Sequence, residues 1–221
     1  MNFIYCRGGD KTAPKLARDA GMLYGIRYDY TAYDDVYMLD AGLAPKWAPY
    51  KRKVKMHRPT FALVPDFETF RDAIEIALYI QDLRDLGVPL IGVAPKFSGA
   101  LAQIDIAEDI IICESIPTTY SGFLIPDDEL KKCRYHLLGG DIRQHLAEIK
   151  RIRAHGGEVV SIDSNKLAMK ASHGQIWNGE KWESVNNSTK VNAQISARNI
   201  MKSLNISYVD NIVDIGVRIE T

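Results

Sequence analysis

Acidic residues stand directly behind several short apolar runs of the chain, where carboxyl groups can transfer protons, attack electrophilic carbon or bind cations. They are Asp29, Asp40, Asp66, Glu114 and Asp163. Each one alone has an ordinary explanation, because Asp favours strand-end turns and helix N-caps. Five carboxyl groups that meet at one edge would repel one another unless they served a cation, a polar substrate or proton transfer. The pattern therefore predicts that this edge, called the carboxyl rim below, is the functional site.

Motifs that would indicate a different chemistry are missing. The sequence has no HExxH, DxD or CxxC, and its five histidines follow no ligand spacing, so nothing enforces the magnesium site that several carboxylates could form. It also lacks a GxSxG elbow, a P-loop and a GxGxxG fingerprint. Three widely spaced cysteines argue against a disulfide framework or a structural zinc site. We therefore predict no metal ion and no cofactor.

These carboxyl groups need a scaffold, and short apolar runs with little polar alternation supply it. Such runs are typical of strands that are covered on both faces of a parallel sheet. They span residues 3–6, 23–28, 36–39, 61–64, 89–94, 110–113, 135–138 and 159–162. Eight runs separated by connectors predict an α/β fold, a small (β/α)8 TIM-like barrel, with an open doubly wound sheet as the alternative. In both folds, functional groups gather at the carboxyl ends of the strands.

Amphipathic segments between the runs predict helices, among them residues 70–86 and 141–155. On the second of these helices His145 is expected to lie in solvent, whereas His136, inside an apolar run, is expected in the core. The face of the first helix that is expected to be buried holds Phe70, Ala73, Ile74, Ala77 and Leu78.

The pattern changes after residue 174. Residues 175–182 combine strand-forming residues with an Asn-Gly turn, which predicts a hairpin, and a last helix is expected near residues 191–204. We therefore predict a catalytic barrel domain over residues 1–174 and a C-terminal hairpin and helix, packed on the barrel, over residues 175–221.

The overall charge is balanced, with 28 Lys and Arg against 28 Asp and Glu in 221 residues, so attraction to nucleic acid requires a local patch. The basic run at residues 46–58 is either a solvated loop or a phosphate-binding segment beside the strand end at Asp40. No apolar run reaches the roughly 18 residues of a membrane span, and no secretory leader is recognisable. These features predict a cytoplasmic protein, in the host cytoplasm if a phage encodes it, with no membrane partner.

The order of five short motifs resembles a known family. They are VYMLDAG at residues 36–42, LVPD at 63–66, GVA at 92–94, LLGG at 137–140 and VSIDS at 160–164. Together they look like a shortened guanine transglycosylase barrel. The resemblance is closest to the reduced queuine tRNA-ribosyltransferase-like proteins of phages and bacteria, some of which insert 7-deazaguanines into DNA.

This resemblance implies roles for single residues. Asp40 matches the family's general acid/base, Asp66 matches the aspartate that recognises the Watson–Crick edge of the base, and Asp163 matches the nucleophile. Gly139 and Gly140 match a Gly-Gly pair whose backbone contacts the base. A tight turn that opens a helix is the other explanation for these two glycines.

Two departures from the family pattern affect the prediction. Residues 95–99 stand in place of a base-contacting Gln-Gly-Gly, which brings Lys96 to the site. Asp29 and Glu114, at neighbouring strand ends, complete the expected substrate-binding set. The cysteine-rich zinc segment of the tRNA-modifying members is absent, which favours DNA over tRNA as the substrate.

We therefore predict a transglycosylase-like enzyme that exchanges guanine in nucleic acid for a free 7-deazaguanine base through a covalent aspartyl intermediate at Asp163, with Asp40 handling the proton. The alternatives are a base hydrolase of the same fold and a nucleotide-binding module without turnover. The oligomeric state is left open. The residues expected to hold phosphates are Lys51, Arg52, Lys53, Lys55 and Arg58.

Overall fold

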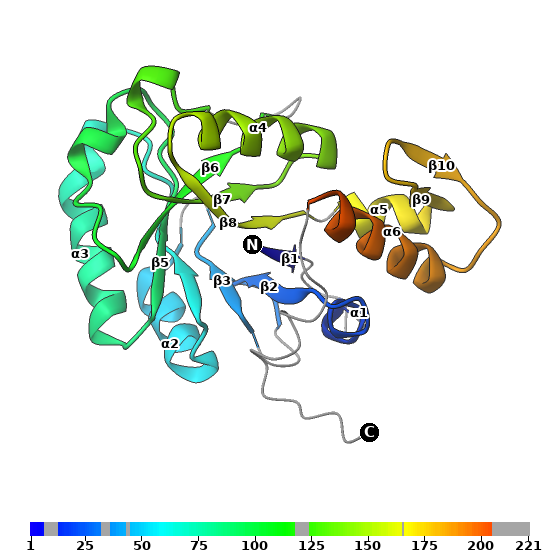
Figure 1. The fold of residues 1–221 in the computed structure, drawn as a ribbon. Helices are drawn as coiled ribbons and strands as arrows, with labels where there is room; N and C mark the ends of the chain where they lie inside the picture. The colour runs from blue at the N-terminus through cyan, green and yellow to red at the C-terminus, as the bar shows by residue number, and fades with distance from the viewer. Residues whose placement is uncertain (7–12, 32–35, 43–44, 118–123, 165, 205–221) are drawn as a thin grey trace, which may run out of the picture.

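Eight parallel strands form the centre of the molecule, which is described by a computed structural model (Figure 1). The structure describes residues 1–6, 13–31, 36–42, 45–117, 124–164 and 166–204. The strands are β1 (Asn2–Cys6), β2 (Leu23–Arg27), β3 (Met38–Asp40), β4 (Phe61–Leu63), β5 (Leu90–Val93), β6 (Ile110–Ser115), β7 (Arg134–Leu138) and β8 (Glu158–Asp163). Because β1 pairs with both β2 and β8, the sheet closes on itself. This closure confirms the predicted barrel and excludes the open sheet.

The outer layer of the barrel is incomplete. Its helices are α1 (Ala13–Asp19), α2 (Trp47–His57), α3 (Ala73–Asp85), α4 (Ile142–Ala154) and α5 (Lys166–Ser172), with short 3-10 helices η1 (Phe70–Asp72), η2 (Ala100–Gln103) and η3 (Asp127–Glu129). Within the described residues, β2, β5 and β6 are followed by no α-helix, although a regular barrel has one after every strand. No helix in this part of the chain is long and apolar enough to cross a membrane.

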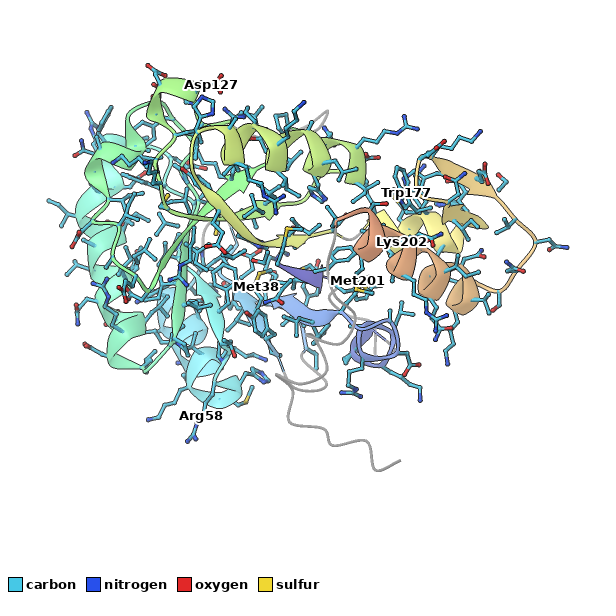
Figure 2. The ribbon with its side chains drawn as sticks, in the orientation of Figure 1. Met38, Arg58, Asp127, Trp177, Met201 and Lys202 are labelled. Atoms are coloured by element: carbon cyan, nitrogen blue, oxygen red, sulfur yellow. The ribbon has the colours of Figure 1, made fainter. Side chains whose placement is uncertain are left out.

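Apolar side chains fill both faces of the barrel wall. A larger cluster lies between the strands and the surrounding helices. The inner cluster consists of Ile4, Leu23, Met38, Phe61, Leu63, Ala94, Ile111 and Cys113, and Figure 2 shows Met38 near the centre of the ring of strands. Alternate residues of a strand point to opposite faces of the wall. This alternation also determines which side chains at the strand ends reach the mouth of the barrel.

Gly92 lies on the inner face of β5, where a Cβ atom would come within 2.7 Å of Cys113 Sγ and 2.9 Å of both Leu63 and Phe61. We expect Gly92→Ala to destabilise the protein by about 1–3 kcal/mol, because an added methyl group forces packed side chains out of their rotamers. Urea denaturation measures this change. Cys113→Ala in the same chain should recover part of the loss, and simple additivity of the two changes would contradict this packing.

The buried face of α3 is not the predicted one. Phe70, Ile74 and Leu78 are exposed, and so is Ala77, so the prediction for this helix was wrong. Both sides of the helix carry apolar residues, and periodicity alone does not tell which side the barrel covers. The residues that face the barrel are Ile76, Ile80 and Leu83.

The buried face of α4 is wider than the predicted stripe. Ile142, Ile149 and Ile152 are buried, and Leu146 lies at the exposed border of this face. His145 is also buried, so the expectation that it lies in solvent was wrong. The reason is a local contact at the start of the helix, which is described with the site below.

The C-terminal part contains the expected hairpin and helix. β9 (Gln175–Trp177) and β10 (Trp182–Ser184) pair in antiparallel fashion, with Trp182 opposite Trp177. Helix α6 (Thr189–Ser203) begins at Ser188, whose hydroxyl accepts the Val191 N–H. It contacts α5, β9 and α1, and so lies beside the barrel (Figure 1). Residues 205–221 of the predicted C-terminal domain lie outside the described residues.

Candidate active site

Three aspartates and a lysine from four strand ends gather at the carboxyl rim of the barrel. Asp40 and Asp163 end β3 and β8, and Asp66 and Lys96 follow β4 and β5. The fully buried thiol of Cys113 lies on the inner face of β6. Burial raises the pKa of Cys113, the charges of all three aspartates raise it further, and the Lys96 charge lowers it. The Cys113 side chain is thus within electrostatic reach of all four groups, which stand at the carboxyl ends of β3, β4, β5 and β8.

Asp163 is the most strongly oriented of these groups, and only 8% of it is exposed. Its Oδ1 accepts a 2.5 Å hydrogen bond from the Gly139 N–H, and its carboxyl group also bonds the Cys6 thiol at the end of β1. Burial raises the pKa of Asp163 to about 6, although these two hydrogen bonds lower it. Near neutral pH the group is therefore ionised, held in place and poorly solvated, as a nucleophile or base requires.

Asp40 is held by its own turn. Its Oδ1 accepts a 2.8 Å hydrogen bond from the N–H of Gly42, which has a φ of +74°. Burial raises the pKa of Asp40 and the charge of Asp66 adds to this, whereas the Gly42 hydrogen bond and the charges of Arg27 and Lys96 lower it. Because its pKa is raised, Asp40 holds a proton more readily than a surface aspartate, but Asp163, whose pKa is about 6, is also raised, so the roles of the two carboxyl groups rest on the motifs that they match and not on their pKa values.

Asp66 and Lys96 form an ion pair at the same rim. Lys96 Nζ lies 3.2 Å from Asp66 Oδ2, and the ammonium also donates to the hydroxyl of Ser115, the last residue of β6. Burial raises the pKa of Asp66, and the nearby Lys96 lowers it. The pair presents an acceptor beside a donor, so it can bind the polar edge of a planar molecule.

The rim thus combines an oriented carboxylate, a carboxyl group that can carry a proton and a donor–acceptor pair. Two carboxyl groups in different environments are the means by which glycosyl-transfer enzymes separate the roles of nucleophile and acid. Among the described residues, no three His, Cys, Asp or Glu side chains are grouped so that they could hold a metal ion.

Comparison with known proteins assigns the chain to a family. The family model of DUF6610, a family of unknown function, matches residues 17–207. The chain belongs to the DUF6610 family. No curated protein matches this DUF6610 chain.

Among solved structures, the DUF6610 chain is similar to the fructose-bisphosphate aldolase of Campylobacter jejuni. The TM-score is 0.53 at 12% sequence identity, and the similarity covers 96% of this chain and 90% of the aldolase. At this identity the likeness shows a shared barrel fold. Since one barrel fold supports many reactions, the chemistry must be argued from the site itself.

Glu114 does not belong to the group at the rim, and the prediction that it does was wrong. Strand β6 continues to Ser115, so Ser115 points into the barrel and Glu114 points to the outer face, beneath α4. There its carboxylate accepts hydrogen bonds from Arg151 at 2.7 Å and from the Ile125 N–H at 2.9 Å.

Asp29 is bound to its neighbour Arg27 and stands apart from the other aspartates. Two hydrogen bonds of 2.6 and 2.7 Å join the guanidinium to the carboxylate, and both side chains are about half exposed. This contact with Arg27 lowers the pKa of Asp29. The charge of Asp40 also acts on Arg27, so the guanidinium lies within reach of both carboxyl groups.

The two glycines after β7, Gly139 and Gly140, have different structural roles. Both have a positive φ, 65° at Gly139 and 79° at Gly140, which favours glycine. A Cβ atom at Gly139 would meet nothing within 4 Å, whereas one at Gly140 would lie 2.5 Å from the Ile116 side chain. Gly139 donates to Asp163, and its carbonyl accepts from the buried Nε2 of His145. His145 therefore fixes the turn that holds Asp163, while Gly140 allows close packing.

The basic run at residues 46–58 forms helix α2. Because α2 follows β3, it starts near the carboxyl rim and runs back along the outside toward the other end of the barrel. Lys51 pairs with Asp82 of α3 at 3.0 Å, and Figure 2 shows Arg58 projecting from the periphery. The structure therefore does not bring the predicted phosphate-binding cations to the aspartates. These cations are Lys51, Arg52, Lys53, Lys55 and Arg58.

Three further residues at the site, Cys6, Cys113 and Ser115, were not predicted from the sequence. A signal for them exists in the strands themselves. Every second residue of a strand points to the same face, so the inner face that holds Ile4 in β1 also holds Cys6. In β6 the inner face that holds Ile111 also holds Cys113 and Ser115.

Proposed function

We propose that this DUF6610 chain is a base-exchange transglycosylase that replaces guanine in nucleic acid, with DNA favoured over tRNA, by a 7-deazaguanine base. One observation carries the proposal. Asp163 and Asp40 stand at one rim in different environments, and each influences the pKa of a common neighbour, Cys113. The order of motifs that the chain shares with guanine transglycosylases supports the same roles for both residues.

In the first step a carboxylate oxygen of Asp163 attacks C1′ of the sugar while the C1′–N9 bond breaks. The transition state resembles an oxocarbenium ion, and the adjacent negative charge stabilises it. The electron pair of the broken bond stays on the guanine nitrogen, which takes the proton of the Asp40 carboxyl group. The products are a glycosyl ester on Asp163 and free guanine.

The second step reverses the first with a new base. The Asp40 carboxylate takes the N9 proton of the incoming 7-deazaguanine, whose nitrogen attacks C1′. The C1′–O bond to Asp163 breaks, and the carboxylate is regenerated. Proton and electron pair balance over the two steps, so the same two residues serve both.

Asp66 and Lys96 are suited to hold the base during both steps. Guanine presents N1–H and N2–H donors beside its O6 acceptor, and 7-deazaguanine keeps this edge unchanged. The Asp66 carboxylate can accept from the donors, and the Lys96 ammonium, 3.2 Å away from it, can donate to O6. A flipped-out nucleotide would expose this edge.

The test is a base-exchange assay with isotopically labelled guanine. The purified chain is incubated with single-stranded DNA, duplex DNA or tRNA, and the nucleosides are then analysed by mass spectrometry. We expect label to enter DNA, and unlabelled 7-deazaguanine bases to replace guanine when they are added. Release of guanine without incorporation would instead show a hydrolase, and binding without either change would show a nucleotide-binding module.

A further inference from the structure

Helix α3 carries a second apolar face that the barrel does not cover. Ile74 and Leu78 lie four residues apart on one side of α3, and Phe70 precedes them on η1, where one edge of its ring packs against Phe97 with 4.6 Å between ring centres. The exposed fractions are 77% for Ile74, 63% for Leu78 and 59% for Phe70. Single apolar residues are common on protein surfaces, but a continuous row of large ones marks an interaction site. We call this row the α3 stripe.

The α3 stripe lies on the flank of α3 that has no neighbouring helix. The opposite flank is covered by α2, because Trp47 stacks on Tyr79 with 4.2 Å between ring centres and donates its indole N–H to Asp82. On the other side, the connection that follows β5 carries only the short η2. Figure 1 shows α3 at the outer edge of the described part of the molecule.

The charges beside the α3 stripe complement those of a second, antiparallel copy of the stripe. Arg71 stands at its N-terminal end and Asp85 at the C-terminal end of α3. If two α3 helices pack antiparallel about a twofold axis near Leu78, Arg71 of each copy comes beside Asp85 of the other. A parallel pair would place like charges together, so the charges favour the antiparallel arrangement.

We infer that the α3 stripe is the interface of an antiparallel homodimer of this chain. Two helices packed along such a stripe lie about 8–10 Å apart. One helix per subunit buries less than the roughly 1,200 Å² of a standard interface, so the dissociation constant is expected in the micromolar range. The dimer uses none of the rim residues, so the inference does not depend on the proposed function.

Sedimentation velocity of the full chain tests this inference, from about 1 to about 200 µM, a range that brackets a micromolar dissociation constant. The mass is expected to double with rising concentration. Ile74→Lys should weaken association at least about tenfold, because it places one unpaired charge from each copy within the apolar interface. Met56→Lys is the matched control, since Met56 is 62% exposed but stands on α2, and it should leave association unchanged.

A charge swap tests the antiparallel geometry. Arg71→Glu should weaken association through like-charge repulsion with Asp85, and adding Asp85→Arg should restore it. Circular dichroism confirms that each variant is folded. The inference is overturned by a chain that stays monomeric over the whole range, by an Ile74→Lys variant that associates like the parent, or by a swap that restores nothing.

Discussion

Asp163→Asn is expected to abolish base exchange while leaving the barrel folded. The amide is nearly isosteric and its oxygen can still accept the Gly139 N–H, so the turn after β7 keeps its anchor. In the proposed mechanism the variant lacks the carboxylate that attacks C1′, and loss of a covalent nucleophile should lower the rate by about 10³-fold or more. Incorporation of labelled guanine into DNA measures this loss. Full activity in Asp163→Asn would overturn the assignment of the nucleophile.

The same variant should gain stability at neutral pH, which separates lost chemistry from misfolding. Burial raises the pKa of Asp163 from an ordinary 3.8 to about 6. A raised pKa means that this carboxyl group stabilises the fold most below pH 4, and that this contribution is lost as the pH rises through 6. Removing the charge should therefore add roughly 1–3 kcal/mol at pH 7 and almost nothing at pH 4. Urea unfolding at both pH values checks the sign.

Asp40→Asn is the matched comparison within the same rim. It leaves the nucleophile in place but removes the proton donor for the departing base, so attack on C1′ should continue slowly. Intact-protein mass spectrometry should then find a trapped protein–nucleic acid adduct in Asp40→Asn and none in Asp163→Asn. An adduct in Asp163→Asn and none in Asp40→Asn would instead make Asp40 the nucleophile and Asp163 the proton donor.

Arg151→Met is expected to destabilise the protein by about 3–5 kcal/mol, because it breaks a buried ion pair and leaves carboxylates without their counter-charge. Arg151 bonds Glu114 at 2.7 Å, Glu148 at 2.6 Å and the Ile125 carbonyl at 2.9 Å. Both glutamates are buried. Urea denaturation measures the loss, and Arg153→Met, on the exposed side of the same helix, is the control.

The loss in Arg151→Met should grow with pH. Burial, followed by the neighbouring Glu148, already raises the pKa of Glu114 in the parent protein, and removing the guanidinium raises it further. A group with a raised pKa stabilises the fold at low pH and loses that contribution as the pH rises. The parent stops losing this contribution above its Glu114 pKa of about 8, whereas the variant goes on losing it, so the two should lie closer together at about pH 7 than at about pH 9.5. Equal losses at both pH values would contradict a network controlled by buried charge.

Much of the site follows from one rule about parallel strands. The sequence shows where apolar runs end, and in a closed parallel barrel all those ends meet at one rim. This rule selected five carboxyl groups, of which the structure brings Asp40, Asp66 and Asp163 to the rim with Lys96, while Asp29 and Glu114 bind arginines elsewhere. It needed no knowledge of any contact between them.

The wrong predictions concern the direction in which side chains point, whereas the eight strands of the barrel and the helices α3 and α4 were predicted correctly. Strand β6 runs two residues further than expected, to Ser115, and its alternation places Glu114 on the outer face and Ser115 on the inner one. On α3 two faces carry apolar residues, and the barrel covers the one with Ile76, Ile80 and Leu83, which leaves Ile74 exposed. His145 is buried with its ring bound to the Gly139 carbonyl six residues before it, a local contact that periodicity does not report.

The place of α6 has a consequence for how the ring is assembled. β1 and β8 come from opposite ends of the barrel sequence, and Phe3 pairs with Ile162, so this seam is the ladder with the longest chain between its partners. Contacts of such long range form late and slowly. Helix α6 contacts α1 and α5, the helices that follow these two strands. Helix α6 therefore bridges the two sides of this seam, is added after the last strand has been made, and opposes the separation of β1 from β8.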